Sequence, residues 1–192
     1  FSKYFVKESI KEFNDLANHA WAEDAIEIMG GKGIINGVDE THYNPAANIS
    51  RAEFCAIVTR MFKYAGKGSM PFGDVTADKW YYKEVLAAYE NNLINGKSAD
   101  TLDPNGLITR QEIAKIVAKV LEHNGYIEAQ KTELDGYTDY SGIAAWAKDG
   151  AAMVIREGII SGIGGNQFAP NKNASRAETA VILYRLYDLL MK

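Results

Sequence analysis

The chain has 192 residues, of which 47% are apolar and 24% are charged, and its formal net charge is -4. These proportions are ordinary for a globular protein, and the length allows one sizeable domain or several small repeats that share a core. The negative charge gives no general attraction to nucleic acid or an anionic membrane, and no apolar run approaches a membrane span, so we expect neither partner.

Residues 1–12 carry Phe1, Phe5 and Ile10 among charged side chains, which predicts a short amphipathic helix with a supporting role. The chain begins without Met and carries no signal-peptide pattern, so we expect a mature or excised segment of a larger protein. The single cysteine, Cys55, cannot form an internal disulfide and is interpreted as a small buried residue rather than a reactive thiol.

Three tandem repeats follow this segment, with a period of about 60 residues. Each repeat has an aromatic residue shortly before an Asp, then a Trp, a turn glycine and a loop proline. The aligned positions are Phe13, Phe72 and Tyr137; Asp15, Asp74 and Asp139; Trp21, Trp80 and Trp146; Gly37, Gly96 and Gly162; Pro45, Pro104 and Pro170. So many fixed positions indicate structural repeats.

The first predicted helix of each repeat runs from about the Trp to residues 30, 90 and 156. It ends at Gly33, Asn92 or Gly158, residue types that tolerate the left-handed conformation after a helix. We interpret the Trp as a large anchor in the core. The turn glycine that follows is explained by a positive φ angle or by a groove that needs open space beside the turn.

The second predicted helix of each repeat begins with a capping box, in which a hydroxyl residue and a Glu satisfy each other's backbone N–H groups. An Arg lies between them, where the helix dipole disfavours a cation. A guanidinium kept three times at this place, beside free helix N–H groups, indicates an anion site. The motifs are Ser50, Arg51 and Glu53; Thr109, Arg110 and Glu112; Ser175, Arg176 and Glu178.

The second helices carry wide apolar faces, which three helices can bury against one another although one repeat alone cannot. We therefore predict an all-α fold of three helix-loop-helix repeats with pseudo-threefold symmetry. The expected parts are an N-terminal helix at 1–12, repeat 1 at 13–65, repeat 2 with its preceding linker at 66–125, and repeat 3 with its linker at 126–192. All of them form one globular unit.

Taken together, the Phe-x-Asp before a Trp, the Gly-Ile-Ile-x-Gly turn, the Phe/Tyr-x-Pro loop and the Ser/Thr-Arg-x-Glu helix start resemble the S-layer homology (SLH) domain. The resemblance covers residues 13 to about 188. It implies a three-pronged, pseudo-trimeric spindle with the second helices at its centre, formed within one monomeric module. It also implies an extracellular role: non-covalent anchoring of a bacterial surface protein to a secondary cell-wall polysaccharide linked to peptidoglycan, often one ending in pyruvylated N-acetylmannosamine.

In the family, binding falls to the motif arginine and to grooves between adjacent prongs. The resemblance therefore implies ligand binding by Arg51, Arg110 and Arg176, and by the turn glycines Gly37, Gly96 and Gly162. Asp15, Asp74 and Asp139 are further candidate ligand contacts. The capping residues Ser50, Glu53, Thr109, Glu112, Ser175 and Glu178 are assigned to structure.

Several alternatives remain open at this point. Each arginine could pair with a nearby carboxylate and tie repeats together, and each aspartate could cap the first helix, line the groove or position the arginine. The tryptophans could stack on a sugar. The chain could also be a protein-interaction or self-assembly scaffold that binds no glycan.

Catalytic and metal-binding patterns are missing from the sequence. His19, His42 and His123 are isolated, and the acidic loops lack the alternating ligands of an EF-hand. There is no phosphate loop, nucleophile elbow or zinc spacing. We therefore expect no enzyme activity, metal or cofactor.

Overall fold

The computed structural model describes residues 10–191, and this part of the chain is all α, with no strand longer than an isolated bridge. Its helices are α1 (Glu23–Gly31), α2 (Arg51–Met61), α3 (Tyr82–Glu90), α4 (Arg110–His123), α5 (Lys148–Arg156) and α6 (Arg176–Met191). Four short 3-10 helices accompany them: η1 (Ala17–Ala22), η2 (Lys131–Leu134), η3 (Tyr140–Gly142) and η4 (Ala145–Ala147). The predicted all-α class is confirmed. The expected helix at 1–12 falls mostly outside the described residues, and residues 10–12 are not helical.

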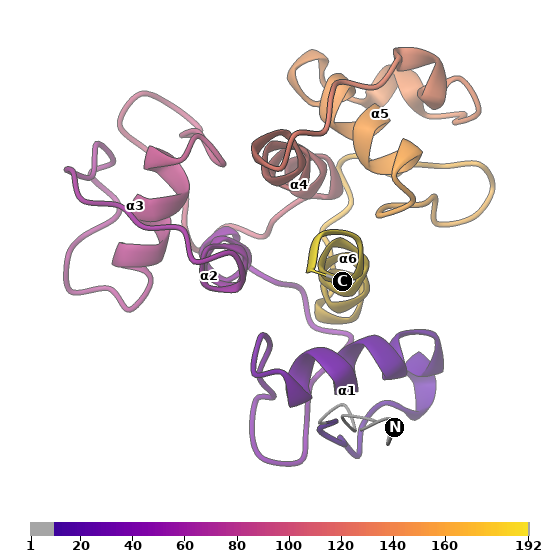
Figure 1. The fold of residues 1–192 in the computed structure, drawn as a ribbon, viewed down its shortest axis with the longest axis horizontal. Coiled ribbons are helices and arrows are strands. Elements are labelled where there is room, and N and C mark those ends of the chain that lie inside the picture. The colour runs from indigo at the N-terminus through magenta and orange to yellow at the C-terminus, as the bar shows by residue number, and fades with distance from the viewer. Residues whose placement is uncertain (1–9, 192) are drawn as a thin grey trace, which may run out of the picture.

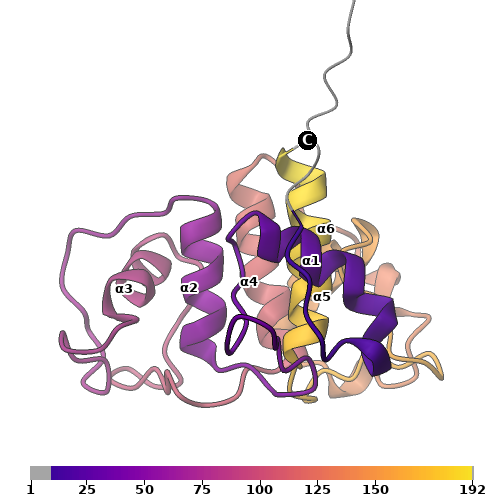
Figure 2. The ribbon, with the colours of Figure 1, turned by 90° about the horizontal axis from the view of Figure 1, so that it is seen from below.

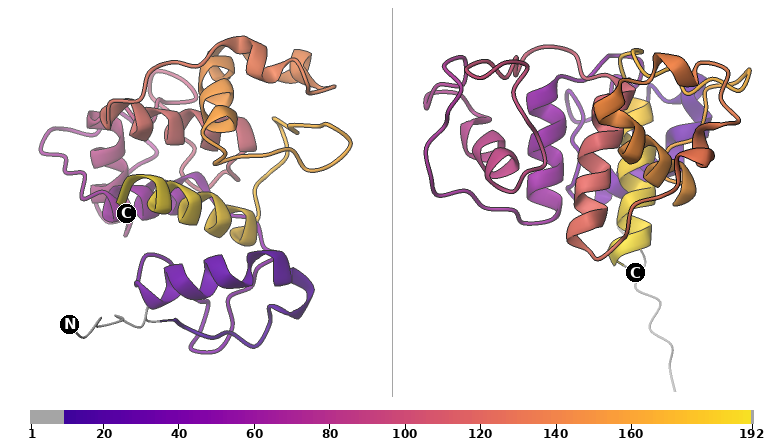
Figure 3. Two further views of the ribbon diagram at one scale, coloured as in Figure 1. Left: turned by 45° about the vertical axis from the view of Figure 1, so that its right-hand side comes forward. Right: turned by 90° about the horizontal axis from the view of Figure 1, so that it is seen from above.

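Each long helix packs most closely against the first helix of the following repeat. Helix α2 packs on α3, α4 packs on α5, and the last helix, α6, packs on α1. Figure 1 looks along α2, α4 and α6, which lie near the middle, while α1, α3 and α5 lie outside them on three arms. Figure 2 shows the three long helices upright and side by side, and Figure 3 shows α6 against α1. Every arm therefore combines helices from two repeats, while the exact pseudo-threefold relation stays a prediction.

A closed ring of backbone hydrogen bonds joins the three repeats just before the long helices begin. The N–H of Ile49 donates to the carbonyl of Ala174 at 3.2 Å, and the N–H of Ala174 donates to Ile108 at 3.0 Å. The N–H of Ile108 completes the ring by donating to Ile49 at 3.1 Å. All three residues are buried, so the ring fixes the starting points of α2, α4 and α6 relative to one another.

The helix ends follow local sequence rules. Gly33, Asn92 and Gly158 have φ angles of 68°, 56° and 68°, which confirms the predicted left-handed residues after the first helices. The segment between α4 and α5, which includes the linker expected before repeat 3, contains η2. This short helix packs on α5 because Leu134 is fully buried.

The interpretation of the three tryptophans as core anchors is wrong. Trp21, Trp80 and Trp146 are 60%, 59% and 51% exposed. Each lies just before the regular part of the first helix, in a turn or a 3-10 segment, where its ring projects to the surface. The buried position of each first helix comes about one turn later, at Ile26, Val85 and Ala151.

Candidate ligand-binding grooves

The three capping boxes form as predicted. The N–H of Ser50 donates to Glu53 Oε2 at 2.8 Å, and the N–H of Glu53 donates to Ser50 Oγ at 3.3 Å. The boxes of Thr109 with Glu112 and of Ser175 with Glu178 are also present.

The first N–H groups of the long helices are not free, contrary to expectation. In α2 the N–H groups of Arg51 and Ala52 donate to the carbonyls of Gly106 and Pro104, both at 2.9 Å. The following repeat thus supplies the acceptors from the loop that carries its proline. Helices α4 and α6 are satisfied in the same way, by the carbonyls of Lys172, Pro170, Ala47 and Pro45. These donors hold the repeats together and are unavailable to a ligand.

The guanidinium of Arg51 is buried and makes three polar contacts with the second repeat. Its Nε donates to the carbonyl of Leu102 at 3.1 Å, and its Nη2 donates to the carbonyl of Asn95 at 3.2 Å. Its Nη1 donates to Glu112 Oε1 at 2.9 Å, and the whole residue is only 6% exposed. Arg51 therefore links the loop before the proline, the glycine turn and the capping box of α4.

The other two arginines repeat the carbonyl contacts but differ in their ion pairs. Arg110 donates to the carbonyls of Phe168 and Ser161 and lies 3.8 Å from Glu178. Burial lowers the pKa of Arg110, although the nearby carboxylate opposes this. Arg176 donates to the carbonyls of Tyr43 and Asn36 and is only half-buried. Within the described chain, no ion pair joins it to Glu53.

The three aspartates hold the loops to which the arginines bind. Asp74 accepts hydrogen bonds from the N–H groups of Leu102 and Asp103, at 2.9 and 2.7 Å. The carbonyl of the same Leu102 accepts from Arg51, so Asp74 fixes the position of the arginine through one residue. Asp15 and Asp139 do the same with Tyr43 and Asn44 and with Phe168 and Ala169.

The turn glycines are required by close packing rather than by a positive φ angle. Gly37, Gly96 and Gly162 are not among the described glycines with positive φ. A Cβ atom on Gly96 would lie 2.3 Å from the carbonyl oxygen of Ser98 and 2.5 Å from the ring of Phe72. The turn therefore folds tightly onto the aromatic residue that opens its repeat.

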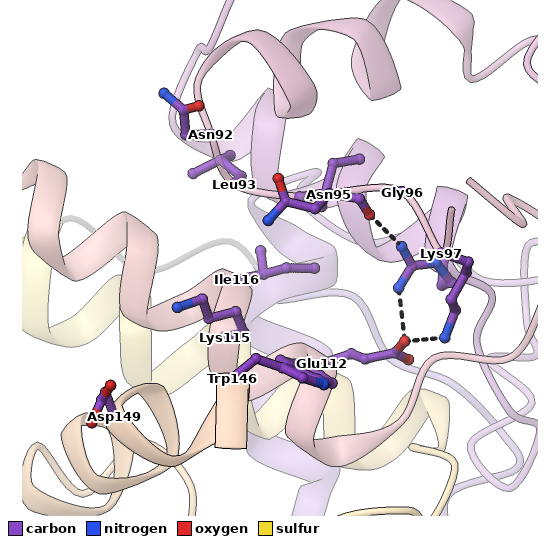
Figure 4. A pocket seen from close by; sticks show the side chains of 12 residues that line it. Asn92, Leu93, Asn95, Gly96, Lys97, Glu112, Lys115, Ile116, Trp146 and Asp149 are labelled. Atoms are coloured by element: carbon purple, nitrogen blue, oxygen red, sulfur yellow. Dashed lines mark hydrogen bonds and ion pairs between the residues drawn. The ribbon is translucent and has the colours of Figure 1, made fainter. Parts of the chain in front are cut away.

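A cleft with a volume of about 710 Å³ lies between the second-repeat turn, α4 and the start of α5. Figure 4 shows it with Glu112 and Lys97 close together, Trp146 below and Lys115 beside Ile116. The cleft is lined by Arg51, residues 92–97, Glu112, Lys115, Ile116, Trp146 and Asp149. Charged side chains line the cleft at the capping box, and the exposed indole of Trp146 forms another part of its lining.

Charged neighbours keep the cleft carboxylate ionised. Burial alone would raise the pKa of Glu112, but hydrogen bonds from Lys97 and from the N–H of Thr109, together with the charge of Arg51, outweigh it and lower the pKa. Lys172, Ser175 and Arg110 lower the pKa of Glu178 in the same way, against its burial.

Among residues 10–191 no group of three or more His, Cys, Asp and Glu side chains is placed to hold a metal ion. Within the same range no helix combines the length and apolar character that a membrane crossing requires.

A comparison with protein families identifies three copies of one domain along the chain. The model of the S-layer homology domain matches residues 12–55, 71–114 and 136–180. The chain belongs to the S-layer homology family. Members of this family are non-catalytic anchoring modules, and in S-layer proteins they bind cell-wall polysaccharide.

Relatives of this SLH chain include enzymes and surface-layer proteins of bacteria. An amylopullulanase of Thermoanaerobacterium thermosulfurigenes is 34% identical over 98% of the chain, and the exoglucanase XynX of Acetivibrio thermocellus is 33% identical over 95%. The surface-layer 125 kDa protein of Lysinibacillus sphaericus is 32% identical over 93%. The chain spans only 10%, 17% and 15% of these three proteins, so the enzyme names refer to their other domains. The comparisons support a cell-wall anchoring role at the cell surface.

The repeat pattern of the sequence does not single out two lysines of the SLH groove, because they have no equivalents in the other repeats. Lys97 follows the turn glycine of the second repeat, where the other repeats have Val38 and Ile163. Lys115 lies on α4, where the equivalent residues of α2 and α6 are Ala56 and Val181. The sequence identifies Trp146 as a repeated residue, but the structure places its ring at the surface of the cleft and not in the core.

Proposed function

We propose that this SLH chain binds an anionic, pyruvylated secondary cell-wall polysaccharide in the grooves between its repeats. It would thereby hold a bacterial surface or S-layer protein on peptidoglycan without a covalent bond. The cleft beside Trp146 supports this proposal most directly, because it combines an exposed aromatic ring with cations in a volume of about 710 Å³. Such a cleft suits a sugar that carries a carboxylate.

The two kinds of lining serve different parts of a pyruvylated sugar. The indole of Trp146 presents an apolar face on which the C–H side of a pyranose ring can lie. The ammonium groups of Lys97 and Lys115 attract the carboxylate of the pyruvyl ketal, since a charge-assisted hydrogen bond contributes about 1.5 to 3 kcal/mol. Both contacts would be made from one side of the ligand, which leaves the rest of the polymer outside.

The candidate residues named from the sequence act indirectly in this proposal, whereas the family resemblance implies direct ligand contacts. Arg51, Arg110 and Arg176 set the charge and shape of each groove from beneath, and the glycines Gly37, Gly96 and Gly162 keep the turns tight. Asp15, Asp74 and Asp139 act through the loops they hold. One chain supplies all three arms, so the module would bind as a monomer.

Calorimetric titration with purified wall polysaccharide, before and after chemical removal of its pyruvyl groups, tests the proposal. We expect binding to the native polymer and a large loss after removal. A chain that binds neither sample, and that instead associates with itself or with a surface protein, would replace anchoring with a scaffold function. The variant Trp146→Ala should weaken binding, whereas Trp80→Ala should leave this cleft unaffected.

A further inference from the structure

The three grooves of this chain differ in their cations. Only the second-repeat groove has lysines both after the turn glycine and on the facing long helix, at Lys97 and Lys115. The groove around Arg176 has Val38 and Ala56 at these places, and the groove around Arg110 has Ile163 and Val181. The repeated Ser/Thr-Arg-x-Glu motif therefore does not make the three grooves equivalent.

The arginine beneath the cleft is already engaged. Each of the three guanidinium nitrogens of Arg51 donates a hydrogen bond within the protein, and the residue is 6% exposed. A ligand carboxylate would have to displace Glu112 or a backbone carbonyl to reach it. Such an exchange would leave a buried acceptor without its donor.

Lys97 is oriented by the same carboxylate that holds the arginine. Its ammonium group and the guanidinium of Arg51 both contact Glu112 Oε1. The side chain of Lys97 is nevertheless 45% exposed, whereas that of Arg51 is 7% exposed. Glu112 is shared by two cations, so this corner of the cleft keeps an excess positive charge that faces solvent.

Lys115 is a second lysine that lines the cleft. Among the residues that the structure describes, no hydrogen bond or ion pair is found for its ammonium group. The second acidic residue of the cleft, Asp149, pairs with Lys131 at 3.1 Å. Figure 4 shows Lys115 beside Ile116, apart from Lys97 and Glu112. The cleft thus presents two separate accessible ammonium groups.

We propose that Lys97 and Lys115 bind the carboxylate-bearing part of the wall polymer and make the second-repeat groove the principal binding site, with Arg51 as a positioning residue. This inference rests on the proposed function and names the groove and the residues that carry it. The half-buried Arg176 leaves the first-repeat groove as the competing site.

The test compares two double variants that remove equal charge. Lys97→Val with Lys115→Ala installs the residues that the first repeat has at these places. Lys67→Ala with Lys119→Ala removes two lysines that do not line the cleft. Each protein is titrated calorimetrically with native and pyruvate-free wall polysaccharide, and urea unfolding confirms that it is folded.

We expect the cleft variant to bind the native polymer at least about tenfold more weakly than the wild type, while the control pair binds within about twofold. Val38→Lys, at an exposed position, should strengthen binding in the first-repeat groove. Equal affinity of the cleft variant and the wild type for the native polymer would overturn the lysine assignment but leave the anchoring function intact. A wild type that binds no polysaccharide would overturn both.

Discussion

Arg51 donates to Glu112 Oε1 at 2.9 Å, although the two residues belong to the capping boxes of successive repeats, 61 positions apart. The other carboxylate oxygen of Glu112 accepts from the N–H of Thr109 at 2.9 Å and so caps its own helix. One carboxylate therefore caps the start of α4 and also binds the first residue of α2. The Ser/Thr-Arg-x-Glu motif therefore links successive repeats in addition to starting a helix.

The strength of the ion pair between Arg51 and Glu112 should be measurable as a coupling energy. We expect a double-mutant cycle of Arg51→Met and Glu112→Gln, followed by urea unfolding, to give about 2 kcal/mol of coupling because the pair is buried. Arg176→Met and Glu53→Gln form the matched cycle, in which no ion pair is found among the described residues, and their coupling should be near zero. Equal coupling in both cycles would contradict the assignment.

Asp74 should stabilise the fold through the loop that Arg51 binds. Replacing it with Ala leaves the N–H groups of Leu102 and Asp103 without their acceptor, which should lower the free energy of unfolding by about 2 kcal/mol. Asp74→Asn keeps one acceptor oxygen and should cost less. The control, Asp135→Asn, changes an exposed carboxylate, and it should leave the urea midpoint unchanged. A similar loss in Asp74→Ala and in the control would refute the role.

Local rules predicted those features of the fold that depend on neighbours in sequence. The capping box of Ser50 and the left-handed residue at Asn92 each need only a few adjacent residues, so the sequence contains all the information. The partners of the first N–H groups lie in another repeat, and no local pattern shows that Gly106 supplies an acceptor for Arg51.

The repeats draw attention to shared positions and away from residues that occur in one groove alone. A search for positions shared by all three repeats gives weight to Arg51 and Gly96, which hold the shared architecture. It gives none to Lys97 or Lys115, because their counterparts are apolar. Residues that distinguish one groove from another are those that a repeat alignment discards, and their place in the cleft becomes visible only in three dimensions.

The turn glycine of the second repeat should tolerate no side chain. In Gly96→Ala the new methyl group would overlap the carbonyl oxygen of Ser98 and the ring of Phe72, so we expect a loss of about 3 kcal/mol in urea unfolding. Gly136→Ala is the matched control, because a Cβ atom there meets nothing within 4 Å and φ is not positive. It should be neutral or stabilising by a few tenths of a kcal/mol. Similar losses in both variants would exclude steric packing as the cause.

Ala169 offers a position at which the protein can be stabilised. Its φ angle is 55°, in the left-handed region that costs an alanine about 1 kcal/mol, and the equivalent residues are Asn44 and Asp103. Ala169→Asn should therefore raise the free energy of unfolding by about 0.5 to 1 kcal/mol in thermal or urea unfolding. Ala65→Asn, at an exposed alanine without positive φ, should have no such effect. A destabilised Ala169→Asn variant would show that strain is not what limits this loop.

Acid should weaken the contacts that Glu112 and Glu178 make between repeats. The folded state holds the pKa of Glu112 and Glu178 below the ordinary value of 4.5, despite their burial, because lysines, backbone N–H groups and arginines surround them. A lowered pKa contributes stability above the ordinary value, and that contribution is lost as the pH falls through the folded pKa. The free energy of unfolding, measured in urea, should therefore decline below about pH 4.5. Glu112→Gln should be less stable than the wild type at neutral pH but should decline less steeply in acid. Parallel pH profiles for the two proteins would show that the protonation of Glu112 does not contribute to acid unfolding.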